Sequence, residues 1–190
     1  MKDFIKNWGL IFLIVLVFLI VRLFIITPVS VKGHSMDPTL ADGQKLMTYQ
    51  LSEINRFDII TTQEPDDMEK LAVKRVIGLP GDRVQMQGDV LSINDEQVEE
   101  TYLQLFKEKF SEDQLQKEYA YNPTFQNIAQ GSENFTNDFT YEVPEGKYFV
   151  LGDNRLISKD SRMFGFVDEE MIKGEVVFRY WPISEIGTIK

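Results

Sequence analysis

The chain has 190 residues and a formal net charge of −10 at pH 7, with 20 Lys and Arg against 30 Asp and Glu. This balance argues against a nucleic-acid partner, because binding phosphates requires a basic face. The lack of cysteine excludes disulfides and thiolate metal sites, and a single His excludes a three-His zinc site within one chain. We therefore expect no metal, and no nucleotide-binding glycine motif points to a cofactor.

The first element of the chain is an apolar run over residues 8–26, interrupted by a single charge at Arg22. A helix needs roughly 20 such residues to cross the hydrocarbon of a bilayer, and a long side chain near one end can reach the interface. The alternative is a cleaved secretory signal, whose apolar part would be about 7–15 residues followed by a small-x-small cleavage site. The sequence therefore predicts a transmembrane anchor over 8–26, in contact with the lipid bilayer.

Two lysines, Lys2 and Lys6, precede this run. Positive charge favours the cytoplasmic side of a membrane. The sequence therefore predicts that residues 1–7 form a cytoplasmic amino terminus and that residues 27–190 form an extracytoplasmic domain of a single-pass protein of the cell membrane.

Beyond Pro28 the pattern changes to short β-type runs separated by turn residues, with Asp42-Gly43 as one clear hairpin signal. Residues rich in β-branched and aromatic side chains read as strands, and such runs cover 46–49, 57–62, 71–77, 84–86, 90–93, 147–151 and 175–180. Short strands at this spacing predict a mainly β domain, with an antiparallel β-sheet and little helix.

Residues 95–141 differ in character and are predicted to be an inserted segment. Within it Tyr102, Phe106 and Phe110 recur at helical spacing in a polar stretch, which predicts a short amphipathic helix over about 101–118. Its aromatic side chains are expected to pack onto the β core, with contact to lipid or substrate as the alternative.

The chemistry of the chain centres on Ser35, which follows closely after the apolar run. A Ser hydroxyl is a weak nucleophile and needs a partner that accepts its proton. The adjacent His34 is poorly placed, because neighbouring side chains on an extended segment point to opposite faces, and a triad would also need a carboxylate.

Lys74 is the better partner for that hydroxyl. An ordinary Lys has a pKa near about 10.4, and burial lowers it by disfavouring the charged form. The apolar residues around Lys74, from Leu71 to Leu79, supply material for such burial. An exposed Lys on a strand is the ordinary alternative for this residue taken alone.

A third polar segment runs from Gly152 to Arg162 and by itself reads as a loop held by ion pairs. Together with the others it forms three ordered motifs: Ser-Met-x-Pro-Thr-Leu at Ser35, Lys-Arg-Val-Ile-Gly-x-Pro-Gly-Asp at Lys74, and Gly-Asp-Asn-Arg-x-x-Ser-x-Asp-Ser-Arg at Gly152. In this order they resemble bacterial type I signal peptidase of the short Gram-positive kind. The resemblance extends to the Phe-Arg-Tyr-Trp-Pro sequence at 178–182, and only 95–141 lacks a counterpart.

The resemblance implies a membrane-bound serine endopeptidase that removes the signal peptides of exported preproteins. It implies that Ser35 is the nucleophile and Lys74 the general base, and that Ser158 hydrogen-bonds the Lys74 amine and orients it. Charged residues are implied to brace the loop that carries Ser158, namely Asp160, Arg162, Asp153 and Arg155.

The resemblance also implies an oxyanion site at the Ser35 backbone N–H and the Gly33 region. Some family members carry a Ser side chain at the Gly33 position, and glycine has no hydroxyl, so a backbone group or a water is the alternative second donor. Family substrates carry small residues before the scissile bond, typically Ala-x-Ala. Shallow pockets for them are expected from Val29, Val31, Met36, Leu40, Ala72 and Val73, with the substrate extended between 29–33 and 70–73.

Two other classes of protein share part of this pattern. A self-cleaving repressor would have a Ser/Lys pair and a β core, but a DNA-binding domain in place of the apolar run. A non-catalytic, membrane-tethered binding protein would need neither Ser35 nor Lys74.

Overall fold

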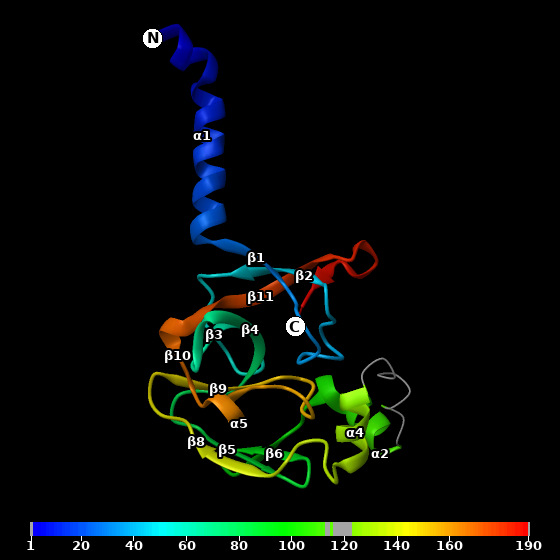
Figure 1. Cartoon of the computed structure of the whole chain (residues 1–190). Helices are drawn as coiled ribbons and strands as arrows, with labels where there is room; N and C mark the ends of the chain where they lie inside the picture. Colours follow the sequence, from blue (N-terminus) through cyan, green and yellow to red (C-terminus); the bar gives the residue numbers. More distant parts are fainter. Residues whose placement is uncertain (1, 113–114, 116–122, 190) are drawn as a thin grey trace.

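The computed structural model of the chain describes residues 2–112, 115 and 123–189 (Figure 1). A β domain is preceded by one long helix, α1 (Lys2–Phe24), which projects from it. The strands form two sheets, and their pairings are antiparallel. The predicted mainly β, antiparallel class is therefore confirmed.

The larger sheet has eight strands in the order β1-β2-β11-β3-β4-β9-β10, with β12 beside β11. Its strands are β1 (Ile26–Ser30), β2 (Lys45–Tyr49), β3 (Ile59–Glu64), β4 (Asp67–Gly78), β9 (Lys147–Leu151), β10 (Val167–Asp168), β11 (Ile172–Trp181) and β12 (Gly187–Thr188). Short helical turns follow several of them, at α5 (Ser161–Phe164), η2 (Glu169–Met171) and η3 (Ile183–Glu185).

The smaller sheet has four strands in the order β7-β6-β5-β8. They are β5 (Arg83–Gln87), β6 (Val90–Ile93), β7 (Glu96–Val98) and β8 (Phe139–Glu142). Buried and less buried residues alternate along β5 and β6, because successive side chains on a strand point to opposite faces. The inward side chains of this sheet pack against β4 and β9 in one core cluster, which holds Ile77, Val84, Met86, Leu91, Ile93, Val143, Phe149 and Leu151.

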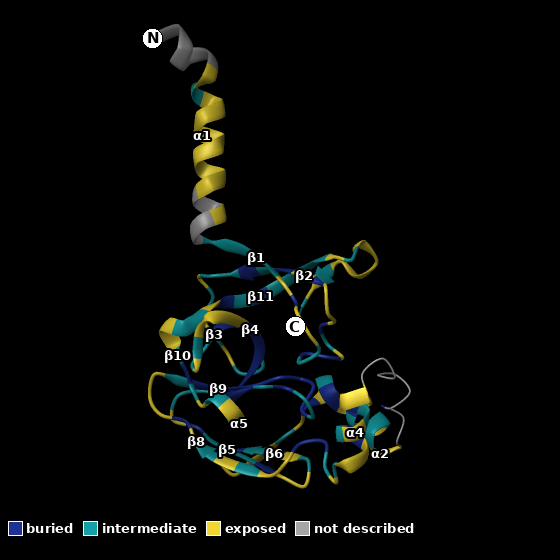
Figure 2. Ribbon diagram, in the orientation of Figure 1, coloured by how far each residue is buried: buried dark blue, intermediate teal, exposed yellow. Residues whose placement is uncertain are grey.

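The segment predicted as an insertion contains β7, a short turn η1 (Thr101–Leu103), α2 (Gln104–Ser111) and α4 (Pro123–Gly131). The helix expected over 101–118 is confirmed at its start, as η1 and α2, while residues 113–114 and 116–118 lie outside the described residues. The aromatic side chains form a separate core cluster, against which Leu156 and Ile157 pack. This segment therefore rests on the loop that carries Ser158. In Figure 2 its helices α2 and α4 carry both buried and exposed residues.

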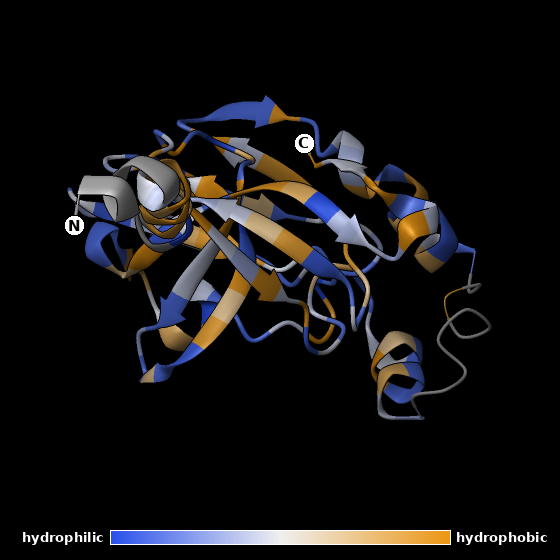
Figure 3. Cartoon of the chain, turned by 90° about the horizontal axis from the view of Figure 1, so that it is seen from above, coloured by the Kyte–Doolittle hydropathy of each residue, from blue (hydrophilic) through white to orange (hydrophobic). Residues whose placement is uncertain are grey.

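Helix α1 carries a row of exposed apolar side chains from Leu10 to Leu19, and Figure 3 shows much of its described part coloured as apolar. Among the described residues, no helix combines the length and apolar character needed to cross a membrane. The anchor over 8–26 therefore stays a prediction. Helix α1 ends at Phe24, two residues before the end of the predicted anchor at Ile26, and β1 begins at Ile26, one residue before the predicted start of the β domain.

Candidate active site

Ser35 lies in the loop that joins β1 to β2, and the loop is fixed from two sides. Met36 and Leu40 are buried in the core cluster beneath it, and the Leu40 N–H donates to the Met36 carbonyl at 3.0 Å. From the loop after β9, the Asn154 N–H donates to the Ser35 carbonyl at 3.0 Å. The nucleophile candidate is therefore held by its backbone on both sides.

Lys74 lies on β4, and its side-chain amine reaches this loop. The Lys74 Nζ lies 3.0 Å from the Ser35 Oγ and donates to the Val73 carbonyl at 3.1 Å. Although Lys74 is only 4% exposed, its amine keeps these two polar partners. Burial lowers the pKa of the Lys74 ammonium, against the opposing effect of nearby carboxylates, chiefly Asp160 and Glu64.

The pairing of β4 explains why this position opens toward the loop. On one side β4 pairs with β3 along its length, with Lys74 opposite Ile60. On the other side β9 pairs with β4 only from Arg75 onward. Within the described residues, the edge of β4 before Arg75 therefore has no neighbouring strand, and a groove lies beside it.

The groove has a volume of about 840 Å³ and is lined by β1, the Ser35 loop and the first half of β4. The predicted substrate-contacting residues that line it are Val29, Val31, Met36, Ala72 and Val73. Leu40 does not line it, because this side chain is fully buried in the core with Leu46 and Val176. The prediction that Leu40 contacts substrate is therefore wrong, because hydrophobicity alone does not tell whether a residue of an irregular loop faces the core or the groove.

Several groove residues were not predicted from the sequence. Ile157 precedes and Lys159 follows Ser158, and Glu64 and Glu69 come from the β3–β4 hairpin. Lys159 forms ion pairs with Glu64 and Asp66, which ties the loop after β9 to that hairpin. No local motif indicated this contact, because its partners are far apart in the sequence.

His34 also lines the groove, but its ring faces a carboxylate. Its Nδ1 lies 3.0 Å from an Asp37 oxygen, and its side chain is 31% exposed. The described contacts of Ser35 Oγ thus come from Lys74 and not from the neighbouring ring, in agreement with the preference for Lys74.

Ser158 differs from its expected arrangement. It is buried, but within the described residues its Oγ has no hydrogen-bond partner, so the predicted bond to the Lys74 amine is not formed. Ser158 lies against Gly152 instead: a Cβ at that glycine would overlap both the Ser158 Oγ and the Ser35 carbonyl. Ser158 therefore packs beside the Ser35 backbone.

Two of the predicted brace residues pair with each other. The Arg162 guanidinium donates to both Asp160 oxygens at 2.8 Å, and Asp160 also accepts from the Gly152 N–H at 3.1 Å. Asp160 thereby joins the start of the loop after β9 to the start of α5, on either side of Ser158.

The other two predicted brace residues pair with residues that the sequence did not single out. Asp153 is bound by Arg75 through two hydrogen bonds, at 2.9 and 2.7 Å. Arg155 forms its ion pair with Glu100, in the segment between β7 and η1. Both pairs are buried.

Of the two backbone N–H groups expected near an oxyanion, only that of Ser35 has no described hydrogen-bond acceptor. No acceptor for the Ser35 N–H is found among the described residues. The Gly33 N–H donates to an Asp42 oxygen at 2.7 Å. Gly33 has a φ of +81°, a conformation that favours glycine. The described ranges contain no group of three or more His, Asp or Glu side chains placed to hold a metal ion.

A hydroxyl in contact with a buried amine, at the wall of a groove, is an arrangement suited to nucleophilic attack on a carbonyl. The family described as "Signal peptidase, peptidase S26" matches residues 3–181. The chain belongs to this family. Membership in the signal peptidase family confirms the resemblance noted in the sequence, and it decides for an enzyme over a non-catalytic binding protein.

Individual signal peptidases match over most of the chain. A signal peptidase I of Streptococcus pneumoniae strain R6 is 44% identical over 98% of each chain. A signal peptidase IB of Staphylococcus aureus is 40% identical over 85% of this chain and 81% of its own. The solved structure of a signal peptidase I from Enterococcus faecalis V583 has a TM-score of 0.50 and 36% identity, covering 66% of this chain and 97% of that one. These matches identify the chain as a serine endopeptidase of the signal peptidase I type.

Proposed function

We propose that the protein is a membrane-bound signal peptidase that cleaves small-x-small sites, with Ser35 as nucleophile and Lys74 as general base. The observation that carries this proposal is the 3.0 Å separation of the Lys74 Nζ and the Ser35 Oγ, with the amine buried. No other hydrogen bond to the Ser35 hydroxyl is described.

In the first half of the reaction, neutral Lys74 accepts the Ser35 proton while the Ser35 oxygen attacks the scissile carbonyl carbon. The Ser35 N–H, which has no described acceptor, donates to the oxyanion as charge develops there. The protonated amine then passes its proton to the nitrogen of the leaving mature chain, and an ester joins the signal peptide to Ser35.

In the second half, water replaces the departed chain. Lys74 accepts a proton from that water, the resulting hydroxide attacks the ester carbonyl, and the proton returns to the Ser35 oxygen as the ester bond breaks. The same amine thus acts as base and acid in both halves. Asp160 and Arg162 brace the loop beside it, while Ser158 contributes by packing against Gly152.

The substrate lies extended in the groove between β1 and the open part of β4. Unpaired strand edges offer main-chain N–H and C=O groups to a peptide, and β9 leaves β4 unpaired before Arg75. Val31 and Ala72 line this groove together with Ser35 and Lys74, and in this proposal they form shallow subsites that accept small substrate residues. Signal peptides with Ala-x-Ala ends meet that requirement.

The anchor is supported by α1. The side chains from Leu10 to Leu19 are exposed, and such a large apolar surface favours lipid over water. The groove begins at Thr27, just beyond the end of α1 at Phe24. An anchored enzyme would hold Ser35 where a tethered signal peptide leaves the bilayer. We place the amino terminus in the cytoplasm and residues 27–190 outside it.

The function is tested by cleavage of a purified preprotein, with the new amino terminus of the product sequenced. We expect the wild type to cut after a small-x-small sequence, and Ser35→Ala and Lys74→Ala to leave the preprotein intact. Full processing by both alanine variants would refute the Ser/Lys mechanism.

The anchor is tested separately, with the full chain reconstituted in phospholipid vesicles. We expect the wild type to resist extraction at alkaline pH, and the double variant Leu13→Asp/Leu16→Asp to be released, because charges are costly in hydrocarbon. Leu105→Asp is the matched control, since Leu105 is an exposed apolar residue of α2. Equal extraction of wild type and double variant would contradict the anchor.

A further inference from the structure

Two buried guanidinium groups flank the Ser35–Lys74 pair. Arg75 follows Lys74 on β4 and makes two hydrogen bonds to Asp153. Arg155 lies in the loop after β9, where its Nε donates to the Gly152 carbonyl at 2.9 Å. One guanidinium therefore fixes the strand that carries the base, and the other fixes the loop that packs on the nucleophile.

Both guanidinium groups are held from outside by residues of the segment between β7 and α2. Arg155 pairs with the Glu100 carboxylate and donates to the Tyr102 hydroxyl at 3.1 Å. The Tyr102 ring covers the other group, with its centroid 3.9 Å from the Arg75 Cζ. The Tyr102 hydroxyl in turn donates to Glu100 at 2.9 Å, so Glu100 and Tyr102 act as one clamp.

Each buried guanidinium of this site has its own carboxylate partner. Arg75 is matched by Asp153, and Glu100 is the described ion-pair partner of Arg155, with side chains 1% and 0% exposed. Burial alone would raise the pKa of Glu100, but the Arg155 and Lys107 cations outweigh it and lower that pKa to about 2. Glu100 is therefore charged at neutral pH, and its loss would leave a buried cation unpaired.

The clamp is connected to the Ser35 loop through Asp153 and Asn154, the two residues that precede Arg155. Asp153 accepts a hydrogen bond from the Thr39 hydroxyl at 2.5 Å, on the loop that carries Ser35. The next residue, Asn154, donates from its N–H to the Ser35 carbonyl. Asp153, Asn154 and Arg155 are consecutive, so a shift of Arg155 moves the groups that hold the Ser35 backbone.

We propose that Glu100 and Tyr102 are positioning residues for the Ser35–Lys74 pair, acting through Arg155 and Arg75. The inference rests on the proposed function and extends it to the segment at 95–141. That segment is then part of the catalytic unit, because its first residues set the distance between base and nucleophile.

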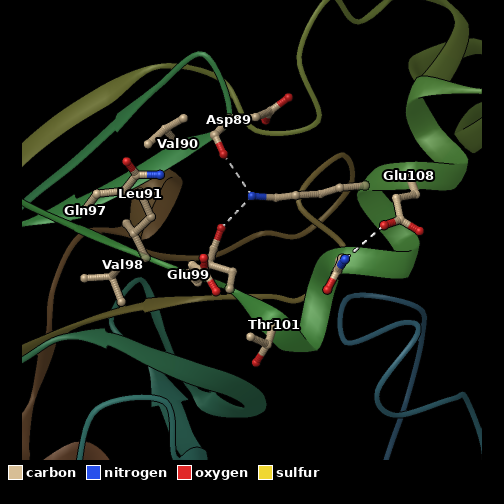
Figure 4. A pocket seen from close by; sticks show the side chains of 11 residues that line it. Asp89, Val90, Leu91, Gln97, Val98, Glu99, Thr101 and Glu108 are labelled. Carbon is tan, nitrogen blue, oxygen red and sulfur yellow. Dashed lines mark hydrogen bonds and ion pairs between the residues drawn. The ribbon is translucent and has the colours of Figure 1, made fainter.

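Lys107, which binds Glu100 on the side away from Arg155, provides a matched control variant. A cavity of about 340 Å³ lies there, and Figure 4 shows its lining side chains, among them Asp89 and Glu108. Lys107 donates to Glu100 and to the Asp89 carbonyl, each at 2.9 Å. Lys107→Gln removes an ion pair of Glu100 without touching Arg75 or Arg155.

The experiment measures kcat and KM for cleavage of one preprotein by full-length variants, well below their melting temperatures. Folded fractions are measured by circular dichroism at the assay temperature. We expect Glu100→Gln to lower kcat about 10- to 100-fold, the scale of a small misplacement of reacting groups, with KM within about threefold because the groove is unchanged. Lys107→Gln should keep kcat within about threefold of the wild type.

Tyr102 separates the two parts of the clamp. Tyr102→Phe keeps the ring over Arg75 but loses the hydroxyl, and Tyr102→Leu loses both. We expect kcat to fall further in Tyr102→Leu. The double variant Glu100→Gln/Arg155→Met should lose no more activity than the worse single variant, because residues that act through one contact are not additive. A purely structural role would lower the folded fraction and leave kcat per folded molecule unchanged.

Ser35→Ala is included in the same assay to separate the two proposals. Wild-type cleavage by Ser35→Ala would refute the proposed function. Two outcomes would refute only the clamp while Ser35→Ala is inactive. One is a folded Glu100→Gln variant with wild-type kcat. The other is an equal loss of kcat in Glu100→Gln and Lys107→Gln. If Glu100→Gln does not fold, the Tyr102 variants decide, and folded Tyr102→Leu with wild-type kcat overturns the inference.

Discussion

The Lys74 Nζ lies 3.0 Å from the Ser35 Oγ, although the two residues are 39 positions apart in the chain. Lys74 lies on β4, which pairs with β3 on one side along its length but with β9 on the other side only from Arg75 onward. The same opening that exposes the edge of β4 to a peptide therefore brings the amine to the hydroxyl. In the proposed mechanism, substrate binding and proton transfer would therefore both depend on this opening in the sheet.

Replacing Lys74 by Met should abolish cleavage without weakening the fold. Met has a similar length but no proton acceptor of useful strength, so we expect kcat/KM to fall by about 10³-fold or more. Because Met removes a buried polar group, the melting temperature should not fall. Lys147→Met, at a partly exposed ion pair with Asp168, is the control and should keep full activity. Substantial cleavage by Lys74→Met would exclude Lys74 as the base.

Cleavage should increase as pH rises through the folded pKa of Lys74. Burial lowers that pKa from its ordinary 10.5, and only the neutral amine accepts the Ser35 proton. The measurement is kcat/KM against pH, with a short peptide substrate for which chemistry is rate-limiting. A profile that stays flat through the neutral and alkaline range would contradict this assignment.

The same pKa shift has a consequence for stability. The folded protein releases the Lys74 proton at lower pH than the unfolded chain does, so between the two pKa values the unfolded chain binds more protons. The contribution of Lys74 to the free energy of unfolding therefore rises with pH in that range and is least favourable below it. Melting temperatures of wild type and Lys74→Met should converge as pH approaches 10.5. A gap that widens with pH would show the opposite shift.

The contact between Ser35 and Lys74 was predictable from the sequence because each residue lies in a local motif. The apolar residues around Lys74 already indicated its burial. The partners of the buried charges were not predictable, because Arg75 lies 78 positions from Asp153 and Arg155 lies 55 from Glu100. A sequence shows that charges are present, but only the fold decides which ones share a buried site. The motif placed Ser158 near the pair, but it could not show that the Ser158 Oγ lies against Gly152 without a hydrogen-bond partner among the described residues.

The buried pair of Arg75 and Asp153 should be costly to break. Asp153→Ala leaves an uncompensated cation in the core, and we expect the free energy of unfolding to fall by about 3–5 kcal/mol. Asp168→Ala is the control, since its ion pair with Lys147 is partly exposed and should be worth about 1 kcal/mol or less. Urea unfolding monitored by tryptophan fluorescence measures both. Equal losses would show that Asp153 is not a structural anchor.

Gly152 should be intolerant of even one added carbon. A Cβ at this position would overlap the Ser158 Oγ and the Ser35 carbonyl, and would lie 2.5 Å from the Ser158 Cβ. The Ser158 Oγ can rotate away, but the Ser35 carbonyl and the Ser158 Cβ are fixed to the backbone, so the loop itself must move. We expect Gly152→Ala to cost about 1–3 kcal/mol of unfolding free energy, as overpacking does, and to lower kcat because the Ser35 backbone shifts.

Gly187→Ala provides the comparison for that variant. Gly187 has no heavy atom within 4 Å of an added Cβ, so the substitution tests the effect of alanine in a strand without a collision. We expect wild-type kcat and a stability change within about 0.5 kcal/mol. Unfolding midpoints and single-turnover cleavage rates, measured side by side, separate the two positions. If Gly152→Ala matched Gly187→Ala in both, the close packing of Ser158 on the Ser35 backbone would not be what holds the nucleophile in place.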